Sequence, residues 1–207
     1  MTISFYGEGC FKVMSGETTV LTDPPHASSG LATPRFKFDV LLKTLTPLPI
    51  NQPDDESVGQ IIGPGEYNIK GINIAGFNLL KESSEKFFKT VFLLEVESLR
   101  LAFLGHISQI PELEIDEHFE EIDILFIPAG GKPFLEQKSA VKLIKQIEPK
   151  IVIPSFYKIS GLKRPADDLK IFLEEINHQK IEPQEKLTIK KKDLAEIKKT
   201  KIVTLKP

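Results

Sequence analysis

The chain has 207 residues, of which 41% are hydrophobic, so it can bury the core of one large domain or of two small ones. Its net charge is only −2, so overall charge gives no reason to expect binding to nucleic acid or to a membrane surface. Cys10 is the only cysteine, which excludes an internal disulfide, and no run reaches the roughly 18 apolar residues of a membrane span. We therefore expect a cytoplasmic protein.

Strands are predicted throughout the first part of the chain. Residues 3–6, 10–14 and 18–22 are rich in β-formers, and Ser15-Gly16-Glu17 is typical of a turn between the second and third strands. Cys10 lies in this apolar region, where a buried free thiol is the ordinary interpretation.

The stretch DVLLKTLTPLPIN, residues 39–51, predicts a buried strand that runs out into a loop. Residues 39–42 form a short apolar run, and Pro47 and Pro49 end regular structure behind it. The loop contains no histidine.

Two hairpins are predicted next. GPGEYNIKGINIAGF, residues 63–77, alternates as strand, Lys70-Gly71 turn and strand. Residues 91–97 and 99–104 form a second hairpin around Ser98.

The second half of the chain alternates strands and helices. Strands over 122–127 and 150–153 flank a helix over 135–146, a βαβ unit, and a second helix is predicted over 165–177. The tail between Lys186 and Lys206 has eight lysines against two acidic residues, and KLTIK and KIVTL alternate as edge strands do.

Several of these segments resemble the metallo-β-lactamase superfamily, and more narrowly its lactonase-like branch of small metal-dependent hydrolases. The resemblance rests on ISFYGEGCFKV, VLTDP, GPGEYNIKG, LRLAFLGH, IDILFIPAGG and PKIVIPSFY, and it extends to KLTIKKKDL in the tail. It implies a four-layer αββα sandwich that forms one domain over residues 1–207.

The resemblance also implies that the metal ligands of this family are missing. Its THxHxDH motif falls on Thr44 onward, with the histidines at Leu45, Pro47 and Ile50 and the aspartate at Pro49. The family's bridging aspartate falls on His106 and its last histidine on Phe156, and the ligand histidine around residues 78–85 has no counterpart. Catalytic zinc needs about three N, S or O protein ligands, and Leu, Pro, Ile and Phe have no lone pair. We therefore expect no metal cofactor.

A few polar residues could still occupy the former pocket. Asp23 ends a strand, where we expect it to cap the turn made with Pro24 and Pro25. The alternative is a rebuilt metal site of Asp23, His26 and His106, holding zinc or manganese if the loops converge. Phe156 and Tyr157 complete the set of vestigial pocket candidates.

The remaining motifs favour structural roles. Glu8 stands where the resemblance places a histidine, and we expect a solvated loop carboxylate. Glu66 and Tyr67 are expected to be hairpin residues. Gly130-Gly131, followed by Lys132, lies between a strand and a helix, where an anion site is the minority interpretation.

The leading hypothesis is a non-catalytic binding or regulatory pseudoenzyme whose partner is a protein, a small molecule or a second copy of the chain. The alternative is a residual or altered hydrolase of an ester, lactone or phosphoester. A third hypothesis, nucleic-acid binding through the basic tail, is disfavoured because few aromatic residues are available there to stack on bases. We also expect the apolar replacements at Leu45, Pro47, Ile50 and Phe156 to fill the former cavity partly.

Overall fold

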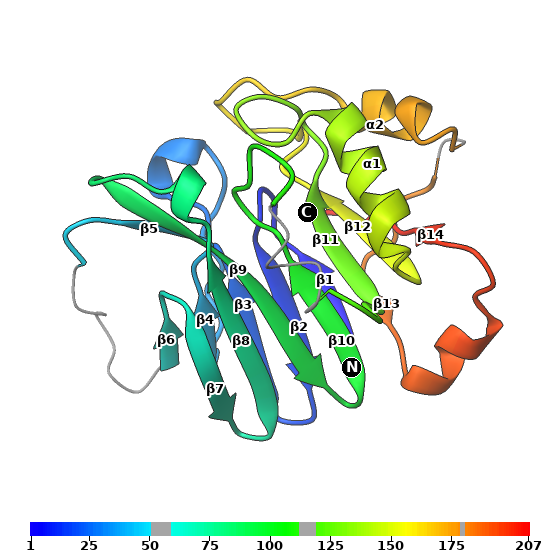
Figure 1. Ribbon diagram of the computed structural model, residues 1–207, viewed down its shortest axis with the longest axis horizontal. Coiled ribbons are helices and arrows are strands. Elements are labelled where there is room, and N and C mark those ends of the chain that lie inside the picture. Colours follow the sequence, from blue (N-terminus) through cyan, green and yellow to red (C-terminus); the bar gives the residue numbers. More distant parts are fainter. Residues whose placement is uncertain (51–58, 112–118, 179–180) are drawn as a thin grey trace.

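The computed structural model describes residues 1–50, 59–111, 119–178 and 181–207. Its described strands form two sheets that face each other, and two α-helices cover one of them (Figure 1). The predicted metallo-β-lactamase-like sandwich is confirmed.

The first sheet contains six described strands in the order β13-β1-β2-β3-β4-β6. They are β1 Thr2–Phe5, β2 Phe11–Ser15, β3 Thr18–Thr22, β4 Val40–Leu42, β6 Gly59–Ile61 and β13 Leu187–Thr188. β1 to β3 form an antiparallel meander, whereas β3, β4 and β6 run parallel. The parallel arrangement brings the carboxyl ends of β3 and β4 to the same edge of the sheet.

The second sheet has the order β14-β12-β11-β10-β9-β8-β7, and β5 pairs with β9 outside this path. Its strands are β5 Leu45–Pro47, β7 Gly65–Ile69, β8 Ile72–Asn78, β9 Phe87–Val96, β10 Leu99–Phe103, β11 Ile124–Pro128, β12 Ile151–Ser155 and β14 Lys201–Ile202. The helices are α1 Gln137–Ile147 and α2 Leu169–Glu175, with short 3₁₀ helices η1 Ala27–Ser29, η2 Leu80–Glu82 and η4 Lys191–Glu196.

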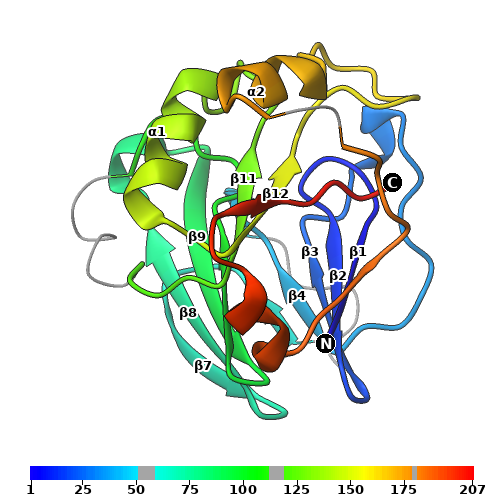
Figure 2. The ribbon, with the colours of Figure 1, turned by 90° about the vertical axis from the view of Figure 1, so that its right-hand side faces the viewer.

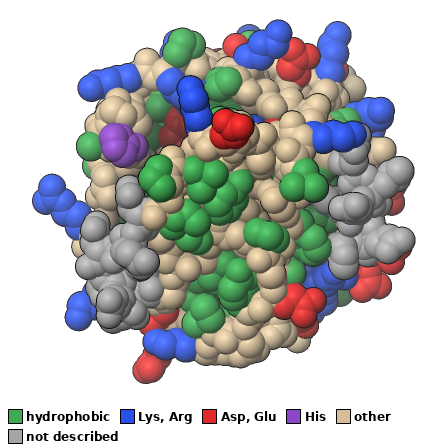
Figure 3. Space-filling model, turned by 60° about the vertical axis from the view of Figure 1, so that its left-hand side comes forward, with side chains coloured by type: hydrophobic (Ala, Val, Ile, Leu, Met, Phe, Trp, Pro, Cys, Tyr) green, Lys and Arg blue, Asp and Glu red, His purple; other side chains and the backbone are tan. Residues whose placement is uncertain are grey.

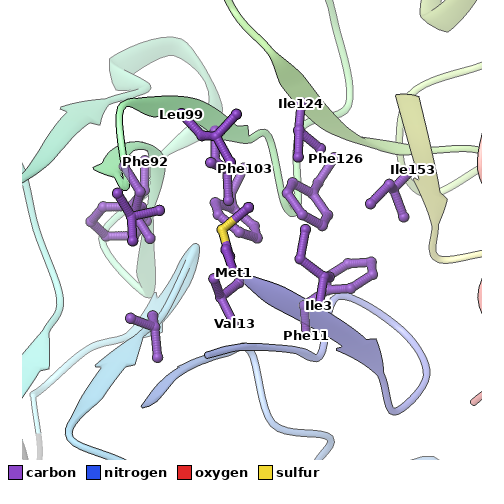
Figure 4. Close-up of a cluster of buried hydrophobic side chains, with 14 of the residues drawn as sticks. Met1, Ile3, Phe11, Val13, Phe92, Leu99, Phe103, Ile124, Phe126 and Ile153 are labelled. Atoms are coloured by element: carbon purple, nitrogen blue, oxygen red, sulfur yellow. The ribbon is translucent and has the colours of Figure 1, made fainter. Parts of the chain in front are cut away.

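The main core lies between the two sheets. Side chains alternate along each strand, so one set from each sheet points to the interior. Met1, Ile3, Phe11 and Val13 come from the first sheet and meet Phe92, Leu99, Phe103, Ile124, Phe126 and Ile153 from the second (Figure 4). The rings of Phe103 and Phe126 stack with centroids 4.1 Å apart, which joins neighbouring strands within this core.

The two outer faces are covered differently. Figure 2 shows α1 and α2 on one side of the molecule and β1, β2 and β3 on the other. Ala140, Val141 and Leu143 of α1 and Phe172 of α2 pack in a second core against the outer face of the second sheet. On the first sheet, Phe36 and Phe38 of the loop between β3 and β4 pack on buried Cys10, Leu21 and Leu41. Among the described residues, these two rings and Tyr6 pack on this face.

Two predicted elements differ from the structure. Leu45–Pro47 is not a loop, because it forms β5, whose backbone pairs with the start of β9. A proline is tolerated at the last position of such a peripheral strand. The second helix begins at Leu169 rather than Pro165, because the Asp168 side chain accepts a hydrogen bond from the backbone N–H of Lys170 and caps the helix there.

Within the described ranges, none of the helices is long and apolar enough to cross a bilayer.

Candidate functional site

A cluster of three polar side chains lies where strands of both sheets end. Asp23 follows β3, Thr44 follows β4 and His106 lies three residues after β10. The backbone N–H of Thr44 donates to Asp23 Oδ1 at 2.7 Å, and the Thr44 hydroxyl donates to Asp23 Oδ2 at 2.6 Å. His106 Nδ1 lies 2.7 Å from the same hydroxyl and 3.8 Å from Asp23 Oδ2. Asp23 and His106, two of the three residues of the alternative metal site, are therefore joined through Thr44.

The Thr44 hydroxyl determines where the protons lie in this cluster. A hydroxyl has one proton to donate, and Thr44 donates it to the Asp23 carboxylate. While Asp23 is ionised, the Thr44 oxygen therefore accepts from His106, which assigns the proton of the neutral imidazole to Nδ1. The expected role of Asp23 as a cap of its own proline turn is wrong, since both of its carboxylate oxygens bind Thr44 on the neighbouring parallel strand.

Burial shifts the pKa values of both ionisable groups. Burial raises the pKa of Asp23 to about 7, and the two hydrogen bonds from Thr44 and the charge of Lys43 oppose this rise. Burial lowers the pKa of His106 to about 3, and the positive charges of Lys89 and Arg164 lower it further. At neutral pH His106 is therefore an uncharged imidazole.

Aromatic rings cover this cluster. The ring centroid of Phe156 lies 4.8 Å from that of His106, and Phe134 lies 5.4 Å from His106 and 4.4 Å from Phe156. Phe156 is 1% exposed and has a backbone φ of 58°, a conformation that side-chain-bearing residues rarely adopt. Gly9 permits its position, because a Cβ there would lie 2.5 Å from Phe156 Cζ. The Phe156 ring is therefore buried beside His106.

An ion pair closes the same region from the loop after Phe156. Arg164 Nε donates to both carboxylate oxygens of Glu8, at 3.0 and 2.9 Å, and its Nη2 donates to the Phe156 carbonyl at 2.6 Å. Its guanidinium carbon lies 4.8 Å from the ring centroid of Phe134. The expectation of a solvated Glu8 is wrong, because Arg164 draws this carboxylate into a partly buried pair with 13% of the Glu8 side chain exposed.

A second ion pair lies near the loop that carries His106. Lys89 Nζ lies 2.8 Å from Glu82 Oε2, and the side chains are 13% and 4% exposed. The backbone N–H and the hydroxyl of Ser108, two residues after His106, both donate to that carboxylate oxygen at 2.7 Å. This network fixes the loop that carries His106.

The residues around the cluster do not fit a catalytic zinc or manganese ion. Such an ion needs about three protein ligands, whereas Asp23 and His106 are two, and Glu8 is held by Arg164. The nearby carboxylates Glu8 and Glu82 are engaged by Arg164 and Lys89, so neither is free to serve as the third ligand. Among the described residues no group of three or more His, Cys, Asp or Glu could hold a metal.

The other predicted pocket residues do not converge on the cluster. His26 is exposed and caps η1, its Nδ1 accepting from the Ser28 backbone N–H. The combination of His26 with Asp23 and His106 in one site is therefore wrong. Tyr157 points into the core between the sheets, where its hydroxyl lies 3.3 Å from the Leu205 carbonyl and burial raises its pKa to about 12.

The four positions aligned with THxHxDH also lie apart from the cluster. Leu45 is partly buried in β5, whereas Pro47, Pro49 and Ile50 are exposed. The expectation that Pro47 and Ile50 fill the former cavity is wrong, because pairing of β5 with β9 turns this segment to the surface.

The structural motifs have simple explanations. Tyr67 donates to the Pro64 carbonyl at 3.3 Å inside its hairpin, and Glu66 is exposed. Gly131 is unsuited to an anion, because the Asp167 carboxylate would lie 2.4 Å from a Cβ there. Lys132 reaches Glu136 instead. Cys10 is fully buried, which raises the pKa of its thiol.

Three surface grooves lie away from the cluster. One follows β7, β8 and β9 on the outer face of the second sheet, where partly exposed Ala75, Phe77 and Leu93 face outward. Figure 3 shows hydrophobic side chains gathered on a face of the molecule and charged ones around them. The other two adjoin the end of α1 and the chain before β14. None of the three is lined by Asp23, Thr44 or His106.

Sequence reasoning missed the role of Thr44 in the cluster and two residues that surround it, Arg164 and Phe134. In the sequence Thr44 was noted only for its resemblance to the threonine of THxHxDH, although its hydroxyl joins Asp23 and His106. Arg164 and Phe134 lie in loops with no recognisable motif, so no signal in one sequence pointed to them.

Comparison with known proteins agrees with the fold. Residues 2–155 match the family model described as the beta-lactamase superfamily domain. A UPF0173 protein of Pyrococcus abyssi is 26% identical over 184 residues, covering 78% of this chain and 85% of the relative. A UPF0173 metal-dependent hydrolase of Listeria monocytogenes is 19% identical over 200 residues, covering 76% of this chain and 85% of the relative.

Solved structures share the architecture. A Thermotoga maritima protein, named as a Zn-dependent hydrolase of the metallo-β-lactamase superfamily, has a TM-score of 0.78 at 23% identity over 99% of this chain and 97% of its own. The metallo hydrolase Igni18 of Ignicoccus hospitalis has a TM-score of 0.66 at 15% identity over 91% and 98%. Because the family model covers most of the chain, this protein belongs to the metallo-β-lactamase superfamily.

Proposed function

We propose that this chain is a non-catalytic member of the superfamily that keeps the hydrolase fold for binding or regulation. The observation that carries this proposal is the way the polar groups at the strand ends bind each other. Thr44 donates hydrogen bonds to both carboxylate oxygens of Asp23, and Arg164 donates to Glu8. The rings of Phe134 and Phe156 pack against His106. A hydrolytic site instead needs an activated water that can reach a substrate.

The charges of the cluster support the same proposal. A general base for hydrolysis works best with a pKa near the working pH and within hydrogen-bond reach of the water. Burial and two cations keep His106 uncharged, but its Nδ1 proton is engaged with Thr44 and aromatic rings pack against the imidazole. Asp23 has a suitable pKa, yet both oxygens accept hydrogen bonds from Thr44.

The competing function is a residual or altered hydrolase of an ester, lactone or phosphoester. It is favoured by relatives named metal-dependent hydrolases and by the short distance between Asp23 and His106. In that case the two side chains would hold a metal together with a group that moves into place.

The test measures metal content and activity on one preparation. The full chain is purified without chelator, dialysed against zinc and then manganese, and analysed by mass spectrometry. The same samples are screened on carboxylic ester, lactone and phosphodiester substrates. We expect metal well below one ion per chain and hydrolysis at the buffer background.

A matched pair of histidine variants makes the test specific. Stoichiometric metal, with hydrolysis that His106→Ala abolishes and His26→Ala keeps, would overturn the proposal. His26 is the suitable control because it is an exposed histidine outside the cluster.

A further inference from the structure

A groove next to the end of α1 gathers lysines from two distant parts of the chain. It has a volume of about 470 Å³ and is lined by Lys145 and Lys150 on one side and by Lys198 and Lys199 on the other. Within the described ranges none of these four lysines forms a salt bridge. Glu148 is the acidic residue in the lining.

The two sides are held together by backbone and side-chain hydrogen bonds. The Thr200 hydroxyl donates to the Pro149 carbonyl at 2.7 Å, and the Lys201 N–H donates to the Lys150 carbonyl at 2.9 Å. These bonds precede the parallel pairing of β14 with β12, which Figure 1 shows beside the end of α1. The charges are therefore brought together by the fold.

Ordinary structural roles do not account for all of these lysines. Lys145 lies in the last turn of α1, where a cation is stabilised by the partial negative charge of the helix end. Lys150, Lys198 and Lys199 lie outside the helix, and Glu148 is the one carboxylate of the lining against the four lysines. Excess like charge in one groove raises the local concentration of anions.

The floor of the groove is apolar. Ile144, Ile202 and Pro149 are buried beneath the lysines, and Ile176 is partly exposed. The lining contains no Phe, Tyr or Trp, and His178 is its one aromatic ring, so it offers few surfaces on which successive nucleic-acid bases could stack. Its volume lies in the range of small-molecule sites.

We propose that this groove binds a small organic phosphate whose aliphatic part lies on the isoleucine floor. The lysines would hold the phosphate as charge-assisted donors, and Ile176 would contact the carbon chain. The site is independent of the Asp23 cluster, so it does not depend on whether the protein is a hydrolase.

Titration calorimetry with hexyl phosphate and with inorganic phosphate tests this proposal. We expect hexyl phosphate to bind more tightly than inorganic phosphate, since only the first contacts the floor. We also expect its affinity to fall as salt screens the lysines.

Charge-reversal variants locate the site. Lys198→Glu/Lys199→Glu is expected to weaken hexyl phosphate binding by about tenfold or more. Lys138→Glu/Lys142→Glu makes the same charge change at two exposed lysines of α1 outside the groove lining, and it should leave binding nearly unchanged. Circular dichroism checks that both variants are folded.

Three results would overturn the proposal. They are no binding of either phosphate at millimolar concentration, equal weakening by the two double variants, or much tighter binding of a single-stranded oligonucleotide that the same Lys198 and Lys199 changes abolish. The last result would assign the lysines to nucleic acid.

Discussion

Replacing Arg164 by methionine tests whether the ion pair with Glu8 holds the covered site together. The substitution removes both Nε bonds to Glu8 and the Nη2 bond to the Phe156 carbonyl, while keeping much of the apolar stem. Breaking a buried ion pair costs about 3–5 kcal/mol, because the remaining charge is left without a partner.

Partial exposure of the two side chains lowers this expected loss of stability. The Arg164 and Glu8 side chains are 23% and 13% exposed, so water can partly solvate the remaining carboxylate. We therefore expect the free energy of unfolding to fall by about 2–4 kcal/mol. The double variant Glu8→Gln/Arg164→Met should lose less than Arg164→Met alone, because no charge remains buried.

Urea unfolding followed by circular dichroism measures this loss, since the chain has no tryptophan. Lys206→Met is the matched control. It also removes an ion pair, between Lys206 and Glu185 at 2.6 Å, but those side chains are 54% and 78% exposed, so a much smaller loss of stability is expected.

The pH dependence gives a second readout of the same variant. Burial already raises the pKa of Glu8, and Arg164 opposes that rise. Without Arg164 the Glu8 pKa should rise further, so the destabilisation should shrink as pH falls and Glu8 becomes protonated. A loss for Arg164→Met no larger than that for Lys206→Met, or one independent of pH, would refute this reasoning.

Three further predictions concern the cluster. Asp23→Asn should gain stability relative to the unmodified protein as pH rises from about 4 to 7, by at most about 1.4 kcal/mol per pH unit, measured as urea midpoints. The sign follows because the pKa of Asp23 is raised from 3.8 to about 7, so the native state loses stability as pH rises across that range. The pKa of His106 is lowered from 6.5 to about 3, which makes the native state gain stability as pH rises. Gly105→Ala should destabilise by about 2 kcal/mol more than Gly16→Ala in thermal unfolding, because both glycines have φ of 55° but only at Gly105 would the Cβ lie 2.0 Å from Thr44 Oγ1. Phe156→Ala should lower the free energy of unfolding by about 3 kcal/mol or more, because a buried ring would leave a cavity, and a loss below 1 kcal/mol by urea titration would show that the rings are not tightly packed.

Two results would contradict the predictions for position 23 and for the two glycines. If Asp23→Asn keeps the pH profile of the unmodified protein, the Asp23 pKa is not raised. If Gly105→Ala and Gly16→Ala are equally stable, Thr44 can move away from the added methyl group.

Much of the fold was predictable because hydrophobic periodicity and turn residues act locally. The alternation around Lys70-Gly71 predicted β7 and β8, and strands 122–127 and 150–153 with the helix between them became β11, α1 and β12. The irregular cover over Leu21 and the pairing of β5 were not predictable, because they depend on contacts between distant segments.

The sequence by itself determined which chemical groups stand at the strand ends: a threonine, an aspartate and a histidine, and the phenylalanine at position 156. Only the tertiary structure decided how they interact. Thr44 meets Asp23 and His106 because β3 and β4 of the first sheet and β10 of the second end close together, and Arg164 reaches Glu8 across 156 residues of chain. The identity of each side chain is read directly from the sequence. Hydrogen-bond partners, and the burial that shifts a pKa, depend on packing between segments far apart in the chain.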